Sequence, residues 1–165
     1  MKQLLFFAFS ALSVIAVNAQ KMNFKNDQMR SAAIGFLKTL SPSQQQQARF
    51  PFEDEERYNW NFVPMARKGI PLKALTETQR DAAMRLLQTA LSDSGYKKTR
   101  AIIDLENILR QVENRPENDE YRDQGKYYFT VFGKPESDSI WGWRLEGHHV
   151  AFNFSSDGRG LVSGT

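Results

Sequence analysis

Apolar residues recur with helical spacing through the first half of the sequence. Between Asp27 and Leu40 they lie three and four positions apart, which predicts an amphipathic helix capped by Asp27. Ser41, followed by a proline and then by Gln44 at the third helical position, forms a capping box. A second, short helix is therefore predicted through Gln47.

Two longer helices are predicted further along the chain. Thr76 and Gln79 form another capping box, and the apolar positions after it stay in helical phase. Gly95 is the predicted stop of that helix. The next helix carries apolar residues in phase from Ile102 to Val112, and the acidic, polar stretch beyond it predicts a surface loop.

The pattern changes to a β type in the last third of the chain. Tyr127–Phe132 is β-branched and aromatic, which predicts a strand buried on both faces. Trp141–Leu145 and His149–Phe154 are predicted as further strands, Asp157-Gly158 as a hairpin turn, and Leu161 as the start of a fourth strand. Helices first and strands afterwards predict an α+β fold, N-terminal helices followed by an antiparallel β-meander.

The first 19 residues predict a signal peptide. Lys2 precedes an apolar run that ends at Val17, and the small residues at Val17 and Ala19 fit cleavage before Gln20. The run is shorter than the ~20 residues of a membrane span, although an uncleaved anchor helix is the alternative. We therefore expect residues 20–165 to be a single domain, without a membrane span, that a bacterium exports to its periplasm or secretes.

Composition excludes several classes of function. The 22 basic and 19 acidic residues give a net charge of +3, which is too even for a dedicated nucleic-acid binder. The absence of cysteine excludes disulfides, a thiol nucleophile and a thiolate metal site. The sequence also lacks a Gly-x-Ser-x-Gly elbow, a phosphate loop and a His-Glu-x-x-His motif.

The only two histidines of the sequence, His148 and His149, stand together within Trp141–Phe154. A single strand of that length would measure ~46 Å at ~3.3 Å per residue, so a hairpin hinged at Glu146-Gly147 is favoured over one continuous strand. In either geometry we expect the two imidazoles to point apart. Two adjacent histidines on one metal ion are therefore not expected.

Glu146 and His148 are the leading candidates for chemistry, either as two metal ligands or as a carboxylate that orients an imidazole general base. Arg144 is a candidate clamp for an anion or substrate, and His149 is expected to pack. Remote carboxylates such as Glu106 could complete a site, so a divalent metal stays open as a cofactor. The alternative is an Arg144–Glu146 ion pair, with His148 hydrogen-bonded beneath a loop.

Aromatic residues supply a second hypothesis. Trp60, Trp141 and Trp143, with neighbouring tyrosines, could line a groove for a flat ligand such as a sugar ring. The alternative is that most of these rings fill the core. Three functions are therefore open: an exported enzyme of hydrolase type, a non-catalytic protein that binds a carbohydrate or other envelope ligand, and a structural interaction domain.

Several segments together resemble the domain-of-unknown-function 3500 family of largely bacterial proteins. They are Trp60-x-Phe62-x-Pro64-x-x-Arg67-x-Gly69-x-x-Leu72, Gln79-Arg80, Leu91-Ser92-x-x-Gly95-Tyr96, Leu105-Glu106-x-x-Leu109, Tyr127–Gly133 and Trp141-Gly142-Trp143-Arg144-x-Glu146-Gly147-His148-His149. The resemblance covers roughly Tyr58 to Phe154. It implies no activity, cofactor or catalytic residue, because the family is uncharacterised. Similar family members run longer, so the resemblance implies a chain truncated at its C-terminus.

Overall fold

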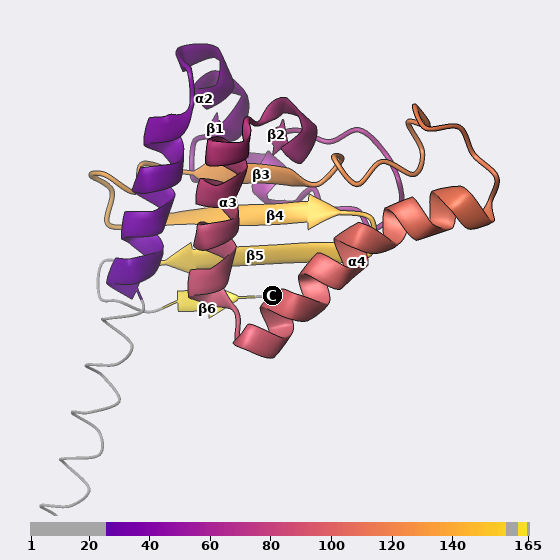
Figure 1. Ribbon diagram of the computed structural model, residues 1–165. Helices are drawn as coiled ribbons and strands as arrows, with labels where there is room; N and C mark the ends of the chain where they lie inside the picture. The colour runs from indigo at the N-terminus through magenta and orange to yellow at the C-terminus, as the bar shows by residue number, and fades with distance from the viewer. Residues whose placement is uncertain (1–25, 158–161, 165) are drawn as a thin grey trace, which may run out of the picture.

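The computed structural model describes residues 26–157 and 162–164, so the predicted signal peptide lies outside the described residues. Helices lie over one face of a single mixed sheet (Figure 1). The strands follow the order β1-β3-β4-β5-β6, and β2 also pairs with β3. Helices precede the long strands in the sequence, so the predicted α+β fold class is confirmed.

The helices begin where the sequence places their caps. The described helical elements are residues 26–39, α2 (Pro42–Ala48), η1 (Glu55–Tyr58), η2 (Leu72–Ala74), α3 (Glu77–Ala90) and α4 (Asp93–Val112). Both predicted capping boxes are present, Ser41 with Gln44 and Thr76 with Gln79. The amide of Gln79 also donates to the side-chain oxygen of Gln44 (2.9 Å), which joins the starts of α2 and α3.

One helix boundary was predicted wrongly. Gly95 does not end α3, because α3 already ends at Ala90 and α4 begins at Asp93. Ser92 caps α4 by accepting a hydrogen bond from the backbone amide of Gly95 (3.2 Å). A serine cap outweighs the tendency of a glycine to stop a helix, since the cap satisfies a donor of the new first turn.

The predicted antiparallel meander is formed by the last strands of the sheet. The strands are β1 (Arg49–Phe50), β2 (Ile70–Pro71), β3 (Tyr128–Phe132), β4 (Trp141–Gly147), β5 (Val150–Ser156) and β6 (Val162–Gly164). Strands β3 to β6 pair antiparallel in chain order, whereas β1 lies parallel to β3. The sequence does not predict β1 and β2, because two-residue strands carry no periodic pattern. The predicted Asp157-Gly158 turn falls partly outside the described residues.

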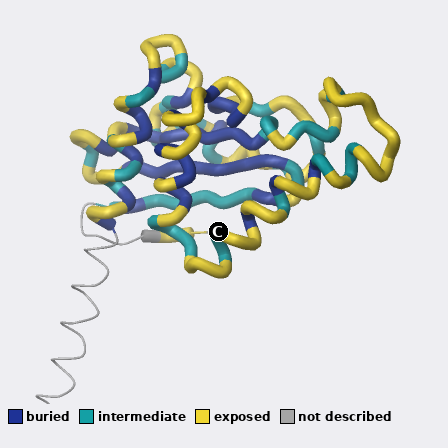
Figure 2. The backbone as a smooth tube through the Cα atoms, viewed as in Figure 1, coloured by how far each residue is buried: buried dark blue, intermediate teal, exposed yellow. Residues whose placement is uncertain are grey.

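The hydrophobic core lies between the helices and the near face of the sheet. Phe129, Trp143 and Phe154 stack across three neighbouring strands, and Phe36 of the first described helix contacts Phe129 at 5.7 Å between ring centroids. Figure 2 shows the strands β3 and β4 almost entirely buried. The prediction that β3 is buried on both faces is confirmed.

The far face of the sheet has polar residues at its centre and carries the segment between β1 and β2. Residues directly opposite each other on neighbouring strands share a face, so Thr130, Arg144 and Asn153 lie together there. Arg144 contacts Glu56 and Asn59 of the connecting segment. The connecting segment, fastened by charged side chains, therefore covers this face, where a three-layer fold would have a second layer of helices.

Candidate functional site

The two histidines form the turn between β4 and β5. Strand β4 ends at Gly147 and β5 begins at Val150, so the predicted hairpin is present but its hinge was placed two residues too early. Glu146 is still part of the ladder and pairs with Ala151. His149 takes the left-handed position of the turn, with φ 58°, and its backbone amide donates to the carbonyl of Phe62 (3.1 Å).

The prediction that the two imidazoles point apart is wrong. Their ring centroids lie 3.9 Å apart, with planes inclined by 31°. The side chains of a strand alternate between faces, but two residues inside a turn follow no such alternation. The His148 side chain is largely buried, whereas His149 is exposed.

Glu106 of α4 is the carboxylate partner of His148. Its Oε1 contacts Nδ1 of the imidazole, although the two residues lie 42 positions apart. Thr99, Ile103 and Glu106 recur four and three positions apart, so all three face the sheet and are buried. An ionised carboxylate only accepts hydrogen bonds, so a hydrogen bond at this contact requires the proton on Nδ1 and leaves Nε2 of the neutral ring with a free electron pair.

Arg122 joins this pair to a second carboxylate. Its Nη1 lies 3.3 Å from Nδ1 of His148 and 3.7 Å from Oε2 of Glu106, while its Nη2 donates to Glu113 (2.5 Å). The guanidinium of Arg122, followed by that of Arg115, lowers the pKa of Glu113 to about 2. Arg122 therefore bridges Glu106 and Glu113 in the cluster formed by these three residues and His148.

Tyr127 contacts the β4–β5 turn through a hydrogen bond. Its hydroxyl donates to the carbonyl oxygen of His148 (2.9 Å). Burial, and to a smaller extent the charge of Glu106, raises the pKa of this phenol above its ordinary value. The hydroxyl therefore stays protonated and remains a donor to the turn at neutral pH.

Glu146 does not pair with His148, which corrects the predicted arrangement. Its two oxygens contact the guanidinium of Arg67 (2.6 Å) and that of Arg144 (3.0 Å), and Arg144 also donates to Glu56 (2.6 Å). All four side chains are at most 3% exposed. Burial raises the pKa of Glu146, against the opposing influence of the arginines.

Arg144 is occupied by protein groups. Besides Glu56 and Glu146, it donates to the carbonyl oxygens of Glu56 (2.7 Å) and Asn59 (2.9 Å). The predicted Arg144–Glu146 ion pair of the alternative interpretation is present. The geometry assigns Arg144 to fastening the connecting segment on the sheet.

The three tryptophans do not line one groove. Trp141 and Trp143 are buried in the core beneath the helices, whereas Trp60 is 53% exposed on the segment that follows η1. A groove of about 320 Å³ does border Trp60, and Trp143 touches it while its ring stacks on Phe129 and Phe154. The predicted aromatic groove therefore exists only in part, with Tyr58 as the second exposed ring.

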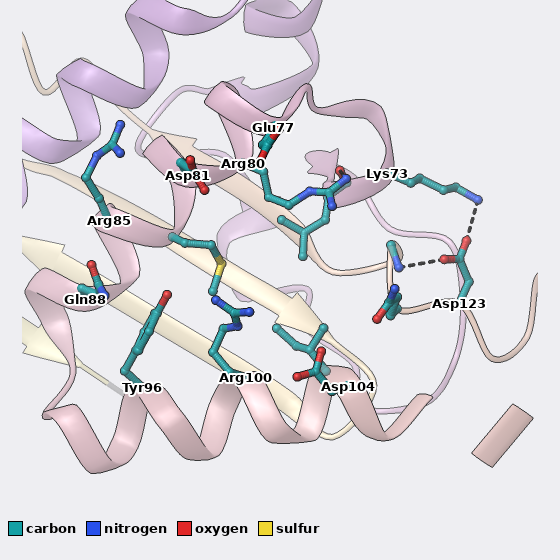
Figure 3. A pocket seen from close by; sticks show the side chains of 15 residues that line it. Lys73, Glu77, Arg80, Asp81, Arg85, Gln88, Tyr96, Arg100, Asp104 and Asp123 are labelled. Atoms are coloured by element: carbon teal, nitrogen blue, oxygen red, sulfur yellow. Dashed lines mark hydrogen bonds and ion pairs between the residues drawn. The ribbon is translucent and has the colours of Figure 1, made fainter. Parts of the chain in front are cut away.

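Two further features bear on chemistry. Within residues 26–157 and 162–164, no group of three or more histidine, aspartate and glutamate side chains is arranged to hold a metal ion. A cleft of about 670 Å³ lies between α3 and α4, where Arg80, Arg100 and Asp104 are among its charged walls (Figure 3). Neither Glu106 nor His148 lines this cleft.

Sequence reasoning missed Glu56, Arg67 and Arg122 as members of the charged clusters. Glu56 and Arg67 lie in segments without periodicity, and Arg122 lies in the stretch predicted as a polar loop. Glu106 carried a usable signal, because a glutamate three positions after a buried isoleucine falls on the apolar face of a helix.

These features define an α+β protein with a histidine–glutamate pair at one end of its sheet and a buried ion network on the sheet's far face. The chain belongs to the family described as protein of unknown function (DUF3500), whose model matches residues 23–165. The family resemblance is therefore confirmed. No curated protein and no solved structure matches the chain. No helix within the described residues is long and apolar enough to cross a membrane.

Proposed function

We propose that this chain is an exported, bacterial enzyme of hydrolase type in which His148 acts as a general base. The observation that carries the proposal is the contact between Nδ1 of His148 and the buried carboxylate of Glu106. A carboxylate at Nδ1 orients the ring, leaves Nε2 free to accept a proton and stabilises the imidazolium that forms. The signal-like N-terminus supports export.

The proposed step is ordinary general-base hydrolysis. Nε2 takes a proton from water while the water oxygen forms a bond to an electrophilic carbon of the substrate. The bond between that carbon and the leaving group then breaks, and the imidazolium returns the proton to the leaving group. Arg122 and Glu106 keep the ring in place through both transfers.

Chromogenic esters, amides and glycosides test this proposal with the purified full chain. We expect His148→Gln to lower the turnover of any substrate that is hydrolysed by about 10²–10⁴-fold, the usual contribution of a general base. Glu106→Gln should also lower turnover, because the tautomer is no longer fixed. His149→Asn is the matched control, since asparagine tolerates the left-handed turn position.

A second measurement needs no substrate. In ¹⁵N spectra of histidine-labelled protein, we expect the neutral form of His148 to carry its proton on Nδ1. A proton on Nε2, or full turnover by a folded His148→Gln variant, would contradict the proposal.

Binding without catalysis is the second candidate function. It is supported by the exposure of Tyr58 and Trp60 beside a groove, a feature that the catalytic proposal does not use. The two functions are separable, because substitution of His148 removes the base and leaves the exposed rings in place.

A further inference from the structure

The segment of residues 58–65, called here the aromatic segment, exposes apolar side chains, whereas charged side chains beside it are buried. The charged side chains that flank it, Glu56 and Arg67, point inward and are 3% exposed. Its large apolar side chains point outward: Tyr58 (68% exposed), Trp60 (53%), Phe62 (61%), Val63 (46%) and Met65 (43%). Exposed apolar side chains are therefore gathered on one short segment, and the first two rings, Tyr58 and Trp60, border a groove.

The aromatic segment is held in place by its backbone. Arg67 donates to the carbonyl oxygens of Asn61 (2.8 Å), Val63 (2.6 Å) and Met65 (2.9 Å), and Arg144 donates to that of Asn59 (2.9 Å). The segment lacks regular secondary structure, yet two arginines with buried side chains fix its carbonyl groups. The backbone that carries the exposed rings is therefore fixed, which lowers the entropic cost of binding a ligand.

A groove of about 320 Å³ runs beside the first two rings of the segment. Its wall and floor combine Tyr58 and Trp60 with the polar residues Asn153 and Ser155 of β5. Oδ1 of Asn153 is buried and accepts no hydrogen bond within the described part of the chain. A buried acceptor without a donor is unfavourable, so a ligand hydroxyl that donates to this amide oxygen gains affinity.

The groove is better matched to a neutral ligand than to an anion. Among the described residues that line the groove, Arg57 is the only cation. That guanidinium already donates to the carbonyl of Phe52 (3.0 Å) and lies over the rings of Phe52 and Tyr58. The volume lies at the lower end of small-molecule sites and is too small for a folded partner.

We infer that this groove binds a pyranose ring of a carbohydrate. The apolar C–H face of the sugar packs on Tyr58 and Trp60, and its hydroxyl groups bond the side chains of Asn153 and Ser155. This inference rests on the second candidate function, binding, and names its ligand class and contact residues. It does not depend on His148.

The test titrates the full chain with soluble β-1,4-linked oligosaccharides of glucose and of N-acetylglucosamine, followed by tryptophan fluorescence and calorimetry. We expect saturable binding to at least one of them. Trp60→Ala should weaken it about tenfold or more, equivalent to ~1.4 kcal/mol, and Trp60→Tyr should restore most of the affinity. Phe62→Ala is the matched control, since Phe62 is also an exposed ring on the same segment but does not line the groove.

Each outcome separates the proposals. Binding that Trp60→Ala weakens and Phe62→Ala leaves unchanged supports the inference, and an additional weakening by Asn153→Ala supports the hydrogen-bonding role. Binding that persists in Trp60→Ala overturns the assignment of the ligand to this groove, while carbohydrate binding as a function is retained. The inference is also overturned if neither oligosaccharide series binds to the folded wild-type protein. Unchanged melting temperatures show that the variants are folded as well. None of these results decides whether His148 is a base.

Discussion

At the scale of single residues, the β4–β5 turn is constrained by space. Gly147 lies under the ring of Tyr127, and a Cβ atom there would stand 2.6 Å from Cε1 of that ring. The same tyrosine donates to the carbonyl of His148. The glycine that makes Glu146-Gly147 resemble a hinge is therefore required by the packing of Tyr127, and the turn itself lies at His148-His149.

We predict that Gly147→Ala destabilises the protein by about 1–3 kcal/mol, because the added methyl group overlaps Tyr127 in a packed site. Urea denaturation monitored by circular dichroism measures the free energy of unfolding. Gly35→Ala is the matched control, since a Cβ at this helical position meets nothing within 4 Å. It should stabilise the protein by roughly 0.5–1 kcal/mol. Equal stabilities of the two variants would contradict the argument.

At the scale of elements, the hairpin depends on one left-handed residue. His149 holds φ 58° and its amide donates to Phe62, so the turn also fastens the aromatic segment. Histidine tolerates this region better than most residues, whereas a β-branched residue does not. The turn position thus explains His149 without a catalytic role.

We predict that His149→Val lowers the free energy of unfolding by about 1–3 kcal/mol, because valine is strained at positive φ. His149→Gly should equal or exceed the wild-type stability, since glycine adopts this conformation without strain. Thermal melts of both variants measure the difference. A valine variant as stable as the glycine variant would show that the turn adopts another conformation in solution.

At the scale of the whole molecule, a buried ion network fastens the connecting segment to the far face of the sheet. Glu56, Arg67, Arg144 and Glu146 together carry no net charge. Their mutual contacts compensate for desolvation only while all partners remain. The network therefore couples the sheet to the presentation of the aromatic segment.

We predict that Arg144→Met destabilises the protein by about 3–5 kcal/mol, because Glu56 and Glu146 lose a buried partner. The aromatic segment should also become more susceptible to limited proteolysis. Arg49→Met is the control, since the Arg49–Glu136 pair is partly exposed and should contribute at most ~1 kcal/mol. The network's structural role would be rejected if the two methionine variants unfolded at the same urea concentration.

Sequence alone determined the helices, the long strands and the family of this chain. Capping boxes such as Thr76–Gln79 and the apolar phase of each helix act between neighbours in sequence, so they are readable without a structure. The aromatic run at Tyr128–Phe132 predicts its buried strand for the same reason. Among the element boundaries, the hinge and the stop at Gly95 were predicted wrongly, because the competing influences were a packed tyrosine and a serine cap.

Only the tertiary structure decided the partners of the charged residues. Glu146 and His148 are close in sequence, but the strand turns Glu146 toward Arg67 and Arg144, while α4 brings Glu106 to His148. The sequence does not identify the partner of a charged residue, because a charged side chain follows no periodic pattern that depends on its partner. These contacts depend on which faces of α4 and of the β4–β5 hairpin pack against each other.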